Sequence, residues 1–260
     1  MNEIQQRELN EQLFNAVVQG NIGQIEELIV AGAEVNAVDE GEKAFSRLSA
    51  LSNTRKRGVV EAANIQQLRL TPLHYAVLSG REMVELLIKE GANINMVSED
   101  GPTLLHYAAA FSDKREVVEL LIKEGANVDA VNKVKNTPLH AATLSGKREV
   151  VELLIGEGAH IDAIDDNGNT PLSWAAEHSQ KGVIESLLEK GANIDVIDGD
   201  GNTPLNCVII SNKIDNAELI VNHIAKLEAT GLYVSPENIQ LKAQIMPEIE
   251  KEYFYIIINH

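Results

Sequence analysis

The chain contains a recurring apolar stripe with the spacing of one face of a helix. In residues 81–91 (REMVELLIKEG), Val84, Leu87 and Ile88 stand at positions i, i+3 and i+4, with charged residues set among them. This pattern is typical of an amphipathic helix that buries one side. Similar blocks follow at residues 115–125, 148–158 and 181–191. The sequence therefore predicts four equivalent helices.

A second element accompanies these blocks, and it begins with Thr-Pro-Leu or, once, with Thr-Leu-Leu. The Thr hydroxyl caps the first turn of a helix, and Pro suits the next position because its missing amide would have no partner there. The threonines step by 32, 34, 33 and 33 residues. We therefore expect five short helices, preceded by Thr71, Thr103, Thr137, Thr170 and Thr203.

Each amphipathic block ends at a glycine, which closes a helix at low cost because it adopts the left-handed conformation. Beyond the glycine an extended segment leads into a turn signal such as Asp165-Asp166-Asn167-Gly168. The equivalent glycines are Gly32, Gly91, Gly125, Gly158 and Gly191.

This order of turn, T-P-L-H-x-A, second helix and Gly-Ala resembles the ankyrin repeat over roughly residues 11–225. The resemblance implies an all-α fold, an ankyrin-repeat solenoid of about six stacked helix-turn-helix units with short inter-repeat β-turn fingers. One helical pair cannot bury its apolar side alone, so neighbouring units must stack into a continuous core.

Departures from the repeat divide the chain into segments. Residues 1–39 are expected to form an N-terminal capping repeat, with Glu11-Gln12 in place of Thr-Pro. Residues 40–70 are an insertion, because the spacing to Thr71 is about 27 residues too long. The insertion is interpreted as a functional loop, a flexible loop or a decayed repeat, and its basic triplet Arg55–Arg57 as solvated charge.

Residues 71–225 carry consensus-like repeats with a degenerate last unit, and residues 226–260 a C-terminal helical cap or tail. Ser235-Pro236 predicts a helix from Pro236 to about Ile245, which Pro247 interrupts or restarts. The apolar run at 253–258 is interpreted as a cover for the open end of the stack, as a docking segment or as the stub of a longer protein.

The composition of the chain limits the kinds of partner and the compartment that we expect. The net charge of -17 repels nucleic acid and anionic lipid and favours a protein partner with a basic patch. A single cysteine, Cys207, excludes an internal disulfide and fits a reducing compartment. Residues 1–10 are polar and no run of about 18 apolar residues occurs, so we expect neither a signal sequence nor a membrane span. We expect an intracellular, cytoplasmic monomer that binds no membrane, with export into a host cell left open.

The sequence contains few residues in patterns typical of catalysis or metal binding. His74, His106 and His140 share one repeat position and should lie roughly 10 Å apart, too far to hold one metal ion. Residues 195–206 resemble a calcium loop but have Asn206 where the bidentate Glu belongs. Phosphate loops and hydrolase motifs are absent from the sequence. We therefore predict no catalytic residue, metal or cofactor, and a protein that is not an enzyme.

The family resemblance places partner contacts on the turn tips and on the exposed inner, concave side of the first helices. We expect Phe111, Leu144 and Leu78 to form an apolar centre with an acidic rim. Tyr75, Tyr107 and Trp174 are expected to pack between repeats. The predicted contact residues are Leu78, Glu99, Asp100, Ala110, Phe111, Lys133, Val134, Leu144, Asp166, Asn167, Glu177, His178 and Asp200.

The leading hypothesis is a non-enzymatic scaffold that binds one partner protein. The near-consensus repeats and the segment LEATGLYVSPENIQ are similar to ankyrin proteins of obligate intracellular bacteria, which implies a secreted effector. The alternative is a substrate-recruiting adaptor whose segment 235–260 docks onto an enzyme such as a ubiquitin ligase.

Overall fold

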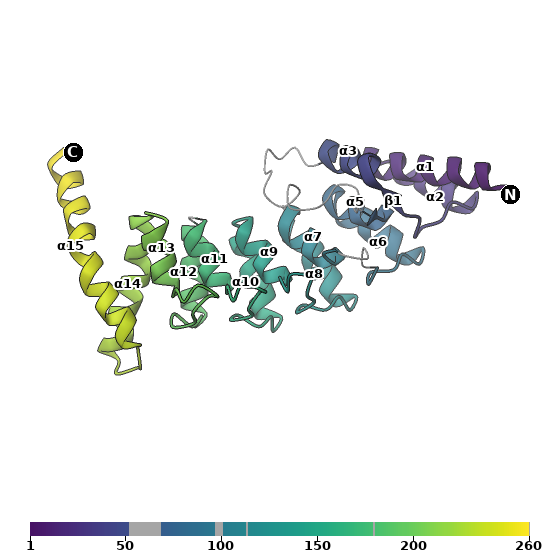
Figure 1. Ribbon diagram of the computed structural model, residues 1–260. Coiled ribbons are helices and arrows are strands. Elements are labelled where there is room, and N and C mark those ends of the chain that lie inside the picture. Colours follow the sequence, from purple (N-terminus) through teal and green to yellow (C-terminus); the bar gives the residue numbers. More distant parts are fainter. Residues whose placement is uncertain (52–68, 97–100, 113, 179, 260) are drawn as a thin grey trace. The chain divides into compact units, whose positions relative to one another are not determined.

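The computed structural model describes residues 1–51, 69–96, 101–112, 114–178 and 180–259 (Figure 1). The chain divides into two compact units, Met1–Lys133 (unit 1) and Val134–His260 (unit 2). Each unit is described by itself below.

Unit 1 is built from helical pairs whose members pack against each other and against the next pair. The pairs are α1 (Glu3–Gln19) with α2 (Ile22–Val30), α5 (Pro72–Ser79) with α6 (Arg81–Lys89), and α7 (Leu104–Phe111) with α8 (Arg115–Lys123). The first helices stack in the order α1, α5, α7, and α6 packs against α8. The additional elements are β1 (Asp39–Glu40), α3 (Gly41–Leu51) and β2 (Arg69–Leu70).

Unit 2 repeats the same arrangement and ends in a long helix. Its pairs are α9 (Pro138–Leu144) with α10 (Arg148–Gly156), α11 (Pro171–Glu177) with α12 (Lys181–Glu189), and α13 (Pro204–Ile210) with α14 (Ile214–Ala229). The first helices α9, α11 and α13 form one row, and the second helices α10, α12 and α14 form another (Figure 1). The last helix, α15 (Pro236–Asn259), packs against α14 and α13. The prediction of an all-α fold of about six helix-turn-helix units is confirmed, since the described residues contain three helical pairs in each unit.

The repeated histidines belong to the helix starts. The backbone amide of Thr71 donates to Nδ1 of His74 at 3.1 Å, and the Thr71 hydroxyl lies 2.9 Å from the same atom. The same arrangement occurs between Thr137 and His140. Burial lowers the pKa of His74 to about 4, so this ring is neutral at physiological pH. These histidines therefore serve the fold.

The first pair begins differently from the others because α1 is longer. Its N-cap is Asn2, whose side chain accepts from the backbone amide of Gln5 at 2.8 Å. Glu11 and Gln12 consequently lie inside the helix, where no capping Thr-Pro is needed. This explains why the sequence motif is missing from the capping repeat.

The predicted break at Pro247 is wrong, because α15 runs through this residue. A proline removes the hydrogen bond to the carbonyl four residues earlier, which here belongs to Ala243. Ala243 and Pro247 are both exposed, so water can satisfy that carbonyl. The opposite side of the helix is held by Asn238 and Ile249, which are 0% and 5% exposed.

Candidate interaction surface

In unit 1 the predicted contact residues differ in accessibility. Leu78 and Phe111 are half-buried, and the Phe111 ring stacks on Tyr107 with centroids 6.0 Å apart. Lys133 is exposed, whereas Ala110 is 3% exposed and can be reached only past its neighbours. Glu99 and Asp100 lie outside the described residues.

In unit 2 most of the predicted contact residues are open to solvent. Leu144 is half-buried, and the others are exposed: Val134, Asp166, Asn167, Glu177, His178 and Asp200. Asp166 forms an ion pair with Lys135 at 2.8 Å, in which both side chains are largely exposed. Leu144 and the pair Leu78 and Phe111 belong to different units, so the single apolar centre stays a prediction.

Three aspartates at equivalent repeat positions organise three of the turns, a role that the sequence analysis did not predict. Asp39, Asp165 and Asp198 each follow a repeat glycine by seven residues. Each accepts a hydrogen bond from the residue that stands four positions after the N-cap Thr of the following first helix, which is Thr71, Thr170 or Thr203. The donors are the Tyr75 hydroxyl at 2.7 Å, the Trp174 indole at 3.1 Å and the Cys207 thiol at 3.7 Å. The aspartate precedes its donor by nine residues in both pairs of unit 2 and by 36 in unit 1, so the repeated spacing could have revealed only the unit 2 pairs from sequence.

In unit 2 the turn itself satisfies the aspartate. Oδ1 of Asp165 accepts the backbone amides of Asn167 and Asn169, each at 2.8 Å. Asp198 accepts the amides of Asp200 and Asn202 in the same way. Partial desolvation raises the pKa of Asp198, but the hydrogen bonds from Asn202 and Asp200 outweigh it and lower the pKa overall.

The insertion lies at the tip of the equivalent turn in unit 1. Asp39 pairs with Leu70 in the antiparallel ladder of β1 and β2, as Asp165 pairs with Asn169 through a backbone hydrogen bond of 3.0 Å. Asn169 stands four positions after Asp165, whereas Leu70 stands 31 positions after Asp39, and this difference accounts for the excess length. The insertion therefore leaves the base of the turn in place and removes the tip whose amides would hold the aspartate.

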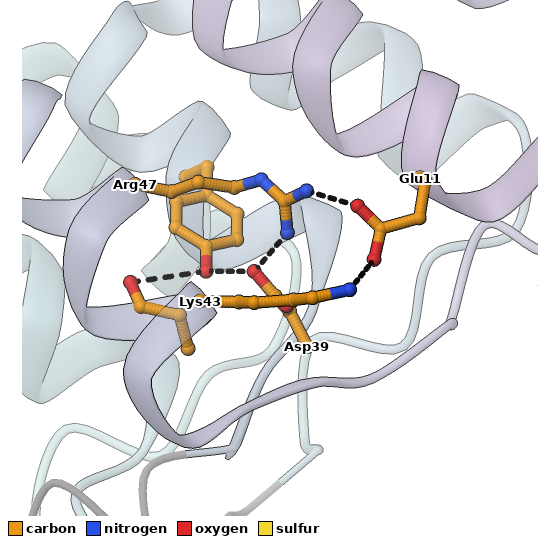
Figure 2. Close-up of polar contacts among 6 residues, drawn as sticks. Glu11, Asp39, Lys43 and Arg47 are labelled. Carbon is orange, nitrogen blue, oxygen red and sulfur yellow. Dashed lines mark hydrogen bonds and ion pairs between the residues drawn. The ribbon is translucent and has the colours of Figure 1, made fainter. Parts of the chain in front are cut away.

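Arg47 on α3 takes the place of those amides (Figure 2). Its Nη1 lies 2.5 Å from Oδ2 of Asp39, its Nη2 pairs with Glu11 of α1, and Lys43 reaches the other oxygen of Glu11 at 2.6 Å. The guanidinium also lies 5.2 Å from the centroid of the Phe14 ring. Charge and hydrogen bonding thus fix α3 to the first helical pair.

The ion pairs change the pKa values of this cluster. The hydrogen bond from Lys43 lowers the pKa of Glu11 more than partial burial raises it. Burial acts to lower the pKa of Arg47, but its hydrogen bonds to Asp39 and Glu11 raise it above the ordinary value. Burial and the neighbouring Asp39 raise the pKa of Tyr75, which keeps its hydroxyl protonated as a donor. These shifts favour the charged forms of Glu11 and Arg47 and the protonated form of Tyr75.

Helix α3 covers the side of the first helices that is open in unit 2. Its Ala44 and Leu48 are 0% and 2% exposed, and α3 packs against α5. Tyr75 is 0% exposed, whereas Trp174 at the equivalent position is half-buried. The first part of the insertion is thus an ordered helix, and the basic triplet Arg55–Arg57 lies outside the described residues.

The described part of the chain contains neither a cluster of metal-ligating side chains nor a helix that could cross a membrane. It contains no group of three or more His, Cys, Asp or Glu side chains that could hold a metal. Among the helices in these same ranges, none has the length and apolar character needed to cross a bilayer.

Stacked pairs of short helices at a period of about 33 residues, with turns between them, define a helical-repeat protein. The family model described as ankyrin repeats (3 copies) matches residues 13–132, 73–165, 105–198 and 139–231. The chain belongs to the ankyrin-repeat family. Ankyrin repeats generally mediate protein–protein interaction, and the family is typically non-enzymatic. A comparison with the curated proteins finds no match.

Proposed function

We propose that the chain is a non-enzymatic interaction module that binds a partner protein through the turn tips and first helices of unit 2. The observation that carries the proposal is the contrast within each repeat of this unit. It is complete in the repeat of α11, where Thr170, Leu172 and Asp165 are buried, while the predicted contact residues Asp166, Asn167, Glu177 and His178 are exposed. Exposed side chains of varied chemistry on a fixed scaffold are what partner recognition requires.

The charge of these positions indicates the partner. Asp166, Glu177 and Asp200 are exposed carboxylates, and the chain as a whole carries a charge of -17. A basic partner surface is therefore favoured, both in the encounter and in the final contact. In unit 1, α3 covers the side of α1 and α5 where such a contact would form, so we assign the partner surface to unit 2.

The test is capture from a eukaryotic cell lysate, with mass spectrometry of the bound proteins. One variant carries Asp166→Lys and Glu177→Lys on the proposed surface. The matched control carries Glu149→Lys and Glu157→Lys, two exposed positions at α10 that make the same change in net charge. Circular dichroism establishes that both variants are folded. A protein captured by the native chain and the control but lost with the first variant supports the proposal, whereas equal loss with both variants contradicts it.

The adaptor hypothesis stays a prediction that the structure makes easier to test. Val234, Asn238 and Ile249 are buried, so deleting all of 235–260 would also remove stabilising contacts. Removing residues 251–260 keeps these three side chains. An adaptor that docks through this end would then keep its target protein and lose the enzyme, whereas retention of both would exclude docking through residues 251–260.

Export into a host cell also stays a prediction, resting on the likeness to ankyrin proteins of obligate intracellular bacteria. A translocation reporter fused to the chain should reach the host cytosol during infection by such a bacterium. A reporter that remains with the bacteria would count against an effector role.

A further inference from the structure

Helix α3 is held on the repeats of unit 1 through a stripe of four side chains. Lys43 and Arg47 stand one turn apart, and each is followed by an apolar residue, Ala44 or Leu48. The apolar pair is buried, and the basic pair forms the ion pairs with the repeats (Figure 2). Every other residue of α3 is at least partly exposed. This is the mode in which an amphipathic helix docks on a groove of another protein.

The surface beneath this stripe has the components of an arginine site. Phe14 and Tyr75 are buried and meet edge to face, with ring centroids 5.9 Å apart. The Arg47 guanidinium lies 5.2 Å from the Phe14 centroid. It also bridges Glu11 of α1 and Asp39 of β1. A planar guanidinium suits such a site better than an ammonium, because it offers donors in a fixed fork and packs on aromatic rings.

The stack of repeats has contacts of its own that do not involve α3. Helix α1 packs directly against α5, and α5 packs against α7. The first helices of unit 2 form the same kind of row, and the described part of that unit has no helix inserted in its turns. The ladder of β1 and β2 closes the base of the turn from which α3 starts. The helical pairs and this turn can therefore stay in place when α3 leaves.

Gly41 joins β1 to α3 and provides a pivot for such a movement. Its φ is +60°, and a Cβ at this position would meet no atom within 4 Å. Because glycine lacks a Cβ, it can change its backbone conformation here at low cost. A rotation about this residue moves α3 and leaves β1 paired with β2.

We propose that the surface formed by Glu11, Phe14, Asp39 and Tyr75 (the covered surface) is a second docking surface, which binds a helix of a partner protein when α3 leaves it. The partner helix has the pattern of α3, with two basic residues four positions apart, each followed by a small or apolar residue. The second basic residue is an arginine, because departure of α3 takes the Arg47 cation away from Asp39. The inference goes beyond the proposed function, which concerns unit 2, and stands or falls independently of it.

In the native chain α3 competes with any such partner from within the molecule. A tethered segment acts at an effective concentration of about 1 mM when its linker is short. The apparent affinity for a partner is reduced by the fraction of molecules in which the surface is open. A free peptide should therefore bind weakly to the native chain and more tightly once the contacts of α3 are weakened.

The first experiment measures, by calorimetry, how the full chain binds an acetylated and amidated peptide with the sequence of residues 41–51. The opened variant carries Arg47→Ala and Leu48→Ala. The matched control carries Ser46→Asp and Ser49→Ala, two exposed positions of α3 that together make the same change in net charge. Circular dichroism establishes that both variants are folded. A peptide with the same composition in scrambled order controls for its charge.

The opened variant should bind the peptide at least about tenfold more tightly than the native chain or the control, because α3 no longer competes. Replacing the arginine of the peptide by lysine should weaken binding about threefold. The scrambled peptide should not bind. Absence of binding to the folded opened variant, or equal binding of the scrambled peptide, would overturn the inference.

A second experiment uses the native sequence and does not depend on the folding of a variant. Hydrogen exchange of the α3 amides is followed with and without the peptide at about 1 mM, the effective concentration of the tethered helix. Displacement by the peptide should make α3 exchange at least about threefold faster, while α5 exchanges at an unchanged rate. Exchange of α3 that does not respond to the peptide would show that α3 is a fixed part of the fold and would overturn the inference.

Discussion

The turn that begins at Asp39 and the turn that begins at Asp165 both supply hydrogen-bond donors to a buried aspartate, but the donor groups differ. Each must satisfy a buried aspartate, since Asp39 is 4% and Asp165 is 5% exposed. The second turn uses its own backbone amides, and the first uses Arg47 from the inserted helix. A buried carboxylate without donors costs several kcal/mol. The comparison teaches that a repeat can accept a long insertion at its tip only if the insertion returns the donors that it displaces.

The largest expected effect comes from removing the substitute donor. Arg47→Ala leaves Asp39 buried without its cation and should lower the free energy of unfolding by about 3 kcal/mol. Urea denaturation measures this. The matched control is Arg81→Ala, which breaks an exposed ion pair with Glu85 and should cost less than about 0.5 kcal/mol. Similar losses for the two variants would show that Arg47 is not a structural donor.

A second prediction concerns the tips of the short turns in unit 2. The amide of Gly199 donates to the carbonyl of Asn167 at 2.6 Å, and a Cβ at Gly199 would lie 2.8 Å from that oxygen. Gly199→Ala should therefore cost about 2 kcal/mol through the steric clash. Gly201→Ala meets no atom within 4 Å but has φ +83°, so it isolates the conformational cost of about 1 kcal/mol. Thermal unfolding of the two variants separates these effects, and a milder loss for Gly199→Ala would contradict close packing of the tips.

A third prediction concerns how stability depends on pH through the buried histidines, and it is tested at His74. The pKa of His74 is lowered to about 4 from 6.5 by burial, so the unfolded chain binds more protons between these values. Stability is fully present above pH 6.5 and falls as the pH drops toward 4, by about 1 kcal/mol between pH 7 and pH 5.5. Burial also lowers the pKa of His140, whose Nε2 lies 3.2 Å from the Asn169 carbonyl. Denaturant titrations of His74→Ser should show a flatter pH dependence, and an unchanged slope would refute the assignment to His74.

The smallest expected effect tests the tip of a turn that has no insertion. Lys135 and Asp166 form an ion pair with side chains 65% and 43% exposed. Lys135→Ala should change the free energy of unfolding by no more than about 0.5 kcal/mol, because solvent screens such pairs. A loss comparable to that of Arg47→Ala would break the distinction between buried and exposed arginine or lysine contacts on these turns.

Local signals made most of the repeat predictable from sequence. The block at residues 81–91 contains α6, and the Thr71-Pro72 pair starts α5, because capping and amphipathic spacing act within a few residues. The histidine position was also correctly interpreted as structural. These features needed no knowledge of distant contacts.

The docking of the inserted helix was harder to predict, because the contacts that hold it join residues that are far apart in the chain. Arg47 lies 36 residues from Glu11, and Asp39 lies 36 residues from Tyr75. The spacing of Ala44, Leu48 and Leu51 fits a short helix, but nothing local indicates where that helix docks. The prediction of a helix break at Pro247 was wrong for the opposite reason. Proline is a strong local signal for a break, but packing on the other side of α15 keeps the helix continuous.

The pairing of Asp39 with Leu70 has a consequence for protein engineering. It brings the two ends of the inserted segment together at the base of the turn, so the repeats on either side keep their spacing whatever lies between. Each doubling of the length of such a segment costs only about 0.6 kcal/mol in chain entropy. The tip between Asp165 and Asn169 is therefore a suitable place to graft a foreign peptide, provided that the graft carries a cation for the aspartate beneath it.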